Sequence, residues 1–140
     1  MSDEIMIAIF TAIGAIIGGG ISHFTSAKIK QIEFRQSNIR HALEIRRKLY
    51  SEFLAEANSL ALNSIEKKSS VPTFLSDISR LLAEIELLAG QDVYDKAKEI
   101  VSHILDLNAE VSNESKVMPE IRAQFVELVK AEFRSIERQT

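Results

Sequence analysis

The sequence predicts an all-α protein in which an N-terminal transmembrane helix continues into an up-down four-helix bundle. Residues 5–24 contain no Asp, Glu, Lys or Arg, and the chain beyond them places apolar residues three or four positions apart. The alternating β-branched runs that indicate strands are missing from the sequence. We therefore expect three parts: residues 1–27 as the N-terminal segment and transmembrane helix, 28–38 as a basic juxtamembrane stalk, and 39–140 as a cytosolic helical bundle.

The uncharged run of residues 5–27 has the length of a membrane span. A helix of these 23 residues is about 35 Å long, and a bilayer's hydrocarbon core is about 30 Å thick. Asp3 and Glu4 precede the run whereas Lys28 and Lys30 follow it, which is the reverse of a cleaved secretory signal. The basic flank predicts that the N-terminus lies outside and the C-terminal domain in the cytoplasm. A buried helix in a soluble oligomer is the alternative.

Small residues in the same run suggest close helix packing. Four of the five glycines lie between Gly14 and Gly20. Gly14 and Gly18 are four positions apart, as are Ala15 and Gly19, and this spacing lets two membrane helices approach closely. We expect these four residues to mediate self-association. Two alternatives stay open, because glycine is common in membrane helices and because consecutive glycines can make a helix flexible.

A basic segment follows the apolar run. Residues 28–48 contain seven Lys or Arg and two acidic residues, whereas residues 49–140 contain ten Lys or Arg and sixteen acidic residues. Basic residues near a span contact anionic lipid, and those further along suit an anionic partner, with a nucleotide messenger as one option and nucleic acid less favoured. Salt bridges within the bundle are the alternative. The candidate residues are Lys28, Lys30, Arg40, Arg46 and Arg47.

One long helix is predicted from the apolar run to about Ile65. Neither Pro nor Gly occurs in residues 21–71, and apolar residues recur at helical spacing through residues 29–60. From Ile39 onward the spacing is close to a heptad repeat, but charged Arg46 occupies one position of the repeat. The pattern therefore allows both a short coiled coil and a bundle face, and the less apolar stretch before Ile39 is expected to be a solvated stalk.

The second helix is expected between a Ser- and Pro-containing loop and a glycine. Residues 67–73, "KKSSVPT", form the loop, with Pro72 near the first turn of the new helix and Gly90 as its stop. Asp92 is the expected N-cap of the third helix, with Asp95 in its first turn. The apolar face of the second helix comprises Leu75, Ile78, Leu81, Leu82, Ile85 and Leu88.

The third and fourth helices are separated by residues 113–116, "NESK", and Pro119 is expected to open the fourth. Isolated helices of this length are marginal in water, so their apolar faces should bury one another in a bundle. The apolar positions of the third helix are Val93, Ala97, Ile100, Val101, Ile104, Leu105 and Val111, and those of the fourth are Ile121, Phe125, Leu128, Val129 and Ile136.

Chemistry-bearing motifs are scarce in the sequence. The chain has no cysteine, and its three histidines, His23, His41 and His103, do not share a helix face. Glu99 and Glu44 could each add one ligand to a neighbouring histidine, which leaves any metal site incomplete. Phosphate loops, dinucleotide glycine patterns and nucleophile elbows are also missing from the sequence. We therefore predict no catalytic residues, no metal, no cofactor and no enzyme activity.

Three segments of the cytosolic part resemble a group of small uncharacterised bacterial proteins that have one N-terminal membrane helix and a cytosolic helical domain. The segments are residues 46–66 ("RRKLYSEFLAEANSLALNSIE"), 78–106 and 125–137. The resemblance implies the same architecture and supplies no mechanism. It also implies a packed seam of Tyr50 and Phe53, and its residues in the first segment are Arg46, Arg47, Leu49, Tyr50, Phe53, Glu56 and Ala57.

The function expected from these features is that of a non-enzymatic, single-span inner-membrane protein. Its cytosolic bundle would act as an interaction or sensing module, as a homo-oligomer with an unidentified cytosolic protein partner. A membrane effector that forms a pore or lesion on a signal, as in phage defence or lysis, is the first alternative. The polar side chains of the span are few and gather at one end, which is a poor channel lining. An accessory subunit of a larger membrane complex is the second alternative.

Overall fold

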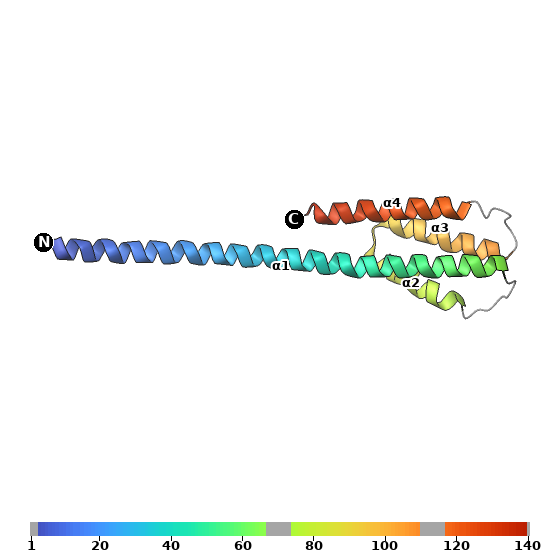
Figure 1. Ribbon diagram of the computed structural model, residues 1–140, viewed down its shortest axis with the longest axis horizontal. Helices are drawn as coiled ribbons and strands as arrows, with labels where there is room; N and C mark the ends of the chain where they lie inside the picture. Colours follow the sequence, from blue (N-terminus) through green and yellow to red (C-terminus); the bar gives the residue numbers. More distant parts are fainter. Residues whose placement is uncertain (1–2, 67–73, 110–116, 140) are drawn as a thin grey trace. The chain divides into compact units, whose positions relative to one another are not determined.

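The computed structural model describes residues 3–66, 74–109 and 117–139, with side chains in residues 25–64, 75–109 and 117–139. Within these ranges all regular structure is helical (Figure 1), so the predicted all-α class with four helices is confirmed. The helices are α1 (Asp3–Glu66), α2 (Phe74–Leu88), α3 (Gln91–Asn108) and α4 (Val117–Glu137). The chain divides into two compact units, Met1–Ile39 and Arg40–Thr140.

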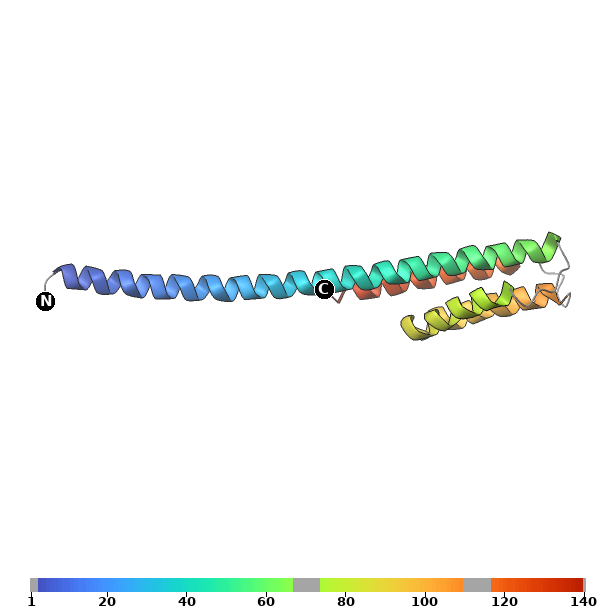
Figure 2. The same ribbon diagram turned by 90° about the horizontal axis from the view of Figure 1, so that it is seen from below.

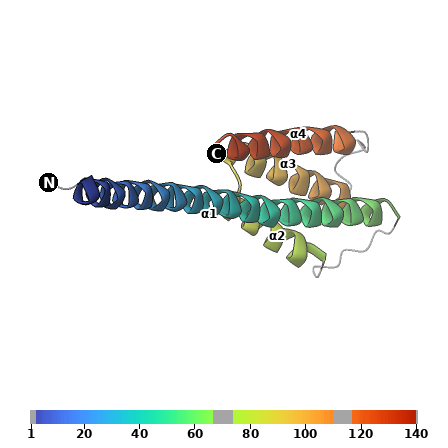
Figure 3. The same ribbon diagram turned by 60° about the vertical axis from the view of Figure 1, so that its left-hand side comes forward.

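The unit Arg40–Thr140 is a helical bundle. Its part of α1 runs in the direction opposite to α2, and the directions continue to alternate through α3 and α4 (Figures 1 and 3). Figure 2 shows α1 with α4 in one layer and α2 with α3 in a second layer. The short turn between α2 and α3 consists of Ala89 and Gly90, and it places their ends beside α1 and α4.

The core lies between the four helices and consists of apolar side chains at helical spacing. Tyr50, Phe53, Ala57 and Leu60 are buried along α1, so the sequence pattern identified the packed face correctly. Because apolar burial stabilises by about 25 cal/mol per Å², these positions supply most of the driving force for folding. The side chains with less than 2 % exposure and the largest volume are Phe53, Phe125, Ile78, Ile85, Ile100 and Ile104.

Some side chains differ from the expected core. Leu88 and Leu105 were placed on apolar faces but are 37 % and 43 % exposed. Leu88 is the last residue of α2, and Leu105 stands at the edge of the apolar face of α3, so neighbouring helices cover each of them only in part. Met118, which the sequence pattern did not select, is 9 % exposed and belongs to the core. Pro119 was expected to open the fourth helix, but α4 begins two residues before the proline, at Val117.

The junction of α2 and α3 also differs from expectation. α2 ends at Leu88, near the predicted stop, but Gly90 has φ −69° and ψ 158° and is therefore extended rather than left-handed. Gly90, not Asp92, is the N-cap of α3, and its carbonyl accepts the first helical bond from the Tyr94 amide at 3.1 Å. Asp92 lies in the first turn, where its negative charge interacts favourably with the positive end of the helix dipole. The expected N-cap was thus two residues too late.

The unit Met1–Ile39 is the N-terminal part of α1. Its described side chains begin at Thr25, and Ile29, Ile32 and Phe34 are 50 %, 57 % and 69 % exposed. In the part of the chain with described side chains, no helix has the length and apolar character needed to cross a membrane. The expected transmembrane helix is therefore not found there, and most of its run, residues 5–24, lies outside that part.

Several further expectations fall outside the described residues. The loops 67–73 and 113–116 and the apolar position Val111 belong to this group. The glycine-mediated packing contacts expected at Gly14, Ala15, Gly18 and Gly19 do as well, since side chains are described only from Thr25.

Candidate functional site

The basic residues selected from the sequence do not share one environment. Lys28, Lys30 and Arg40 are exposed on α1, and so is Arg47. A salt bridge within the bundle was the alternative for these residues, but no ion pair found among the described residues includes Arg47. Arg46, in contrast, is half-buried and is held by hydrogen bonds. The structure thus separates Arg46 from the other four residues of the set.

Arg46 binds the end of α2. Its Nε and Nη2 donate to the carbonyl oxygen of Leu88 at 3.1 and 2.8 Å, and its Nη1 donates to the Ala42 carbonyl at 3.4 Å. The last carbonyls of a helix have no partner within the helix and carry the negative end of its dipole, so a guanidinium is well suited to them. The sequence suggested an anion or a salt bridge for Arg46. A backbone carbonyl 42 positions away has no sequence signature.

Glu132 of α4 completes a polar cluster at this end of the bundle. Its Oε2 accepts a hydrogen bond from the Tyr50 hydroxyl at 2.5 Å, and its Oε1 accepts one from the Gly90 amide at 2.5 Å. We call Arg46, Tyr50, Gly90 and Glu132 the polar cluster. It links α1, the α2–α3 turn and α4 through one carboxylate and one guanidinium. Sequence analysis missed Glu132, because an acidic residue on an amphipathic helix is usually solvated.

Burial raises the pKa of Tyr50 far above its ordinary range, and the hydrogen bond to Glu132 and that group's negative charge raise it further. The positive charge of Arg46 and a hydrogen bond with it act in the opposite direction on this pKa, but more weakly. Tyr50 is therefore a neutral hydrogen-bond donor over the whole physiological pH range. The hydrogen bonds of the polar cluster join α1, the α2–α3 turn and α4 to one another.

Aromatic side chains pack against the Tyr50 ring. The Tyr50 ring meets Phe125 edge-on at a centroid distance of 6.0 Å and lies stacked on Phe133 at 5.9 Å. Phe53 lies 5.5 Å from Phe125. The expected seam of Tyr50 and Phe53 thus packs against α4, and the low dielectric of this environment strengthens the Tyr50–Glu132 hydrogen bond.

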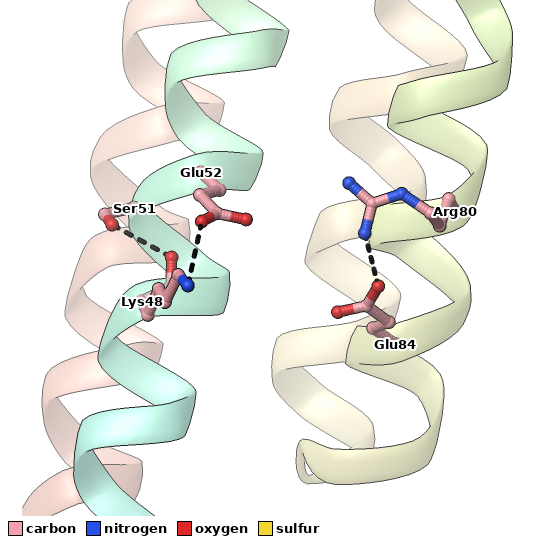
Figure 4. A network of polar contacts seen from close by, with 5 residues as sticks. All are labelled: Lys48, Ser51, Glu52, Arg80 and Glu84. Atoms are coloured by element: carbon pink, nitrogen blue, oxygen red, sulfur yellow. Dashed lines mark hydrogen bonds and ion pairs between the residues drawn. The ribbon is translucent and has the colours of Figure 1, made fainter.

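The ion pairs found among the described residues lie within single helices, and most of their side chains are exposed. Lys48 pairs with Glu52 at 3.9 Å, and Arg80 pairs with Glu84 at 2.5 Å (Figure 4). Ser51 donates to the Lys48 carbonyl at 2.9 Å in the same view. Exposed pairs of this kind contribute at most about 0.5 kcal/mol each, so they adjust solubility more than stability.

The histidines do not form a site with their neighbours. His41 is exposed, and the side chain of His23 lies outside the described residues. His103 is half-buried on α3, and its Nε2 has no hydrogen-bond partner among the described groups. Within the same residues, no three His, Asp or Glu side chains are grouped closely enough to hold a metal ion.

Searches of protein-family models, of curated proteins and of solved structures find no match to this chain. The identification with the group of small bacterial membrane proteins is therefore wrong: no family model supports it, and no membrane-spanning helix is found in the part of the chain with described side chains. The physical reason is that the matching residues, such as Leu49, Tyr50, Phe53 and Ala57, are core positions of α1. Unrelated helical bundles need the same apolar spacing.

Proposed function

We propose that the helical bundle is a non-enzymatic interaction or sensing module that works in association with other protein chains. The exposure of Ile29 and Ile32, which are 50 % and 57 % exposed on the same side of α1, supports this proposal. Large apolar side chains grouped in one short stretch of surface mark interaction sites more often than solitary ones do. The polar cluster adds to the argument, because it engages Arg46, Tyr50 and Glu132 in packing rather than in chemistry.

We further propose that residues 5–27 hold the module at a bacterial inner membrane with the bundle in the cytoplasm. This step rests on the sequence alone: the run lacks charge, has the length of a span and is followed by Lys28 and Lys30. A membrane would concentrate the chains in two dimensions, so weak contacts between them would gain from a high effective concentration. Lys28 and Lys30 would then lie at the level of anionic lipid headgroups.

Photo-crosslinking in living bacteria tests the interaction. A photoreactive amino acid replaces Ile32, and the matched control carries it at Ser79, an exposed position of α2. We expect a covalent adduct with another polypeptide from the Ile32 position and none from the control. A monomer at both positions, at equal expression, contradicts the proposal.

Membrane attachment has a separate test. After cell fractionation, the full chain should stay with the membrane through an alkaline carbonate wash, and a C-terminal tag should resist protease until the inner membrane is opened. Recovery of the chain in the soluble fraction contradicts the attachment.

Dye entry into the same cells tests the alternative of a membrane effector. Rapid entry of the dye with the unchanged chain, lost when Gly14 and Gly18 are both replaced by leucine, would favour a pore.

A further inference from the structure

The stretch 28–39 of α1 carries an exposed apolar stripe. Ile29, Ile32 and Ile39 follow one another at steps of three and seven residues, which places them on one side of the helix. Ile29 and Ile32 are 50 % and 57 % exposed, and Ile39 is partly buried. Phe34, which is 69 % exposed, lies on the opposite side. Ile29 and Ile32 therefore leave apolar surface open to a partner.

One edge of this stripe is positively charged and unpaired. Lys28 and Arg35 lie one heptad apart along that edge, both are exposed, and no ion pair found among the described residues includes either of them. In the bundle, lysines such as Lys48 pair with an acidic residue three or four positions away, whereas the residues four positions after Lys28 and Arg35 are isoleucines. The other edge carries Glu33 and Arg40, whose charges offset each other.

We propose that residues 28–39 bind an acidic amphipathic helix of a different protein. The inference rests on the proposed function, because it names the partner of the same exposed stretch. The apolar side of the partner helix covers Ile29, Ile32 and Ile39 and removes their exposed surface from water. Its carboxylates face Lys28 and Arg35, so these two positive charges gain partners that the described part of their own chain does not provide.

The length of the free stripe limits the partner. Along α1 the same face is buried in the chain's own bundle from Tyr50 and Phe53 onward. About three turns of helix therefore remain for another chain between Lys28 and Ile39. A second copy running parallel would bring its own bundle into the space of the first. A short helix of another protein fits this stretch, and an identical chain does not.

An anionic bilayer is a poorer fit for the same charges. Arg35 lies eight residues beyond the end of the proposed span, residues 5–27, which is about 12 Å along the helix axis. Charge interactions in water are screened over about 8 Å at physiological salt, so lipid headgroups would neutralise Lys28 and leave Arg35 unpaired. A helix lying flat on a bilayer would bury one side only, which leaves either Ile32 or Phe34 in water. A partner helix beside the stripe meets Lys28 and Arg35 together.

Photo-crosslinking from the Ile32 position of the full chain in living bacteria tests the inference, with the crosslinked segment sequenced by mass spectrometry. We expect a segment of another protein that has apolar residues three and four positions apart and an excess of Asp and Glu. Arg35→Gln should lower the yield of the adduct about two- to fivefold, the worth of an exposed charge pair, and Arg35→Glu should lower it further. Asn38→Glu is the matched control, because it changes the net charge by the same amount as Arg35→Gln but lies on the other side of the helix. It should leave the yield unchanged.

A charge exchange gives a second measurement. Replacing the acidic residues of the sequenced segment with lysine should restore the adduct of the Arg35→Glu chain, and failure to restore it overturns the inference. The inference is also wrong if the adduct joins a second copy of this chain or a segment without acidic residues, or if Arg35→Gln and Asn38→Glu lower the yield equally. The interaction function stands in each of these cases. An adduct with lipid alone, or none at all, contradicts both the inference and the proposed function.

Discussion

The hydroxyl of Tyr50 should be a measurable part of the bundle's stability. Replacing Tyr50 with phenylalanine preserves the ring contacts with Phe125 and Phe133 and removes only the donor to Glu132. Tyr50 is 3 % exposed, whereas Glu132 is half-buried and keeps its bond from the Gly90 amide. A hydrogen bond to a charged group is worth about 1.5–3 kcal/mol, and partial hydration of the freed carboxylate oxygen lowers this to about 1–2 kcal/mol.

A double-mutant cycle isolates this contribution. The single variants Tyr50→Phe and Glu132→Ala and the double variant are unfolded in urea and followed by circular dichroism. The free energy of unfolding should show a coupling of about 1–2 kcal/mol between the two sites, because each substitution removes the same bond. Lys130→Ala is a control on the same helix, with an expected coupling to Tyr50→Phe near zero. A Tyr50–Glu132 coupling below about 0.5 kcal/mol would refute the assignment of the cluster as a stabilising contact.

Three other predictions concern the same end of the bundle. Because folding raises the pKa of Tyr50, the stabilisation of the folded bundle by its neutral hydroxyl is complete below the unfolded-state pKa of about 10 and is lost at higher pH. The Tyr50→Phe variant should therefore show a smaller decline of the unfolding free energy at alkaline pH. An unchanged decline would count against this prediction. Gly90→Ala should be neutral or should stabilise the bundle by up to about 1 kcal/mol in thermal unfolding, because alanine adopts a φ of −69° without strain and its Cβ would lie 3.4 Å from Glu132 Oε1, at contact distance. Marked destabilisation would show that the glycine is needed. Arg46→Ala should lower the free energy of unfolding by about 1–2 kcal/mol and speed hydrogen exchange in the last turn of α2. Arg46→Lys should be intermediate, because lysine cannot reproduce both bonds to the Leu88 carbonyl. Equal stability of the two variants and the unchanged protein would argue that the contact is incidental.

The sequence by itself determined the helices and the faces they bury. Apolar residues three or four positions apart make a helix amphipathic, and the burial of Phe53, Ile85, Ile100 and Phe125 follows from that spacing. The positions of the helix ends were less accurate. The N-cap of α3 is Gly90, whose amide donates to a residue of α4, and no local pattern predicts a partner 42 positions away.

Only the tertiary structure decided what the polar residues do. Arg46 was one of several candidates for an anionic partner, yet it caps α2 through the Leu88 carbonyl because the α2–α3 turn brings that carbonyl beside α1. Glu132 resembles any solvated acidic residue in the sequence, and its role depends on the simultaneous approach of Tyr50 and the Gly90 amide. Helical periodicity depends on neighbours in the chain, so sequence can encode it locally. A hydrogen bond between helices depends on how three separate segments pack together, which becomes definite only in the folded bundle.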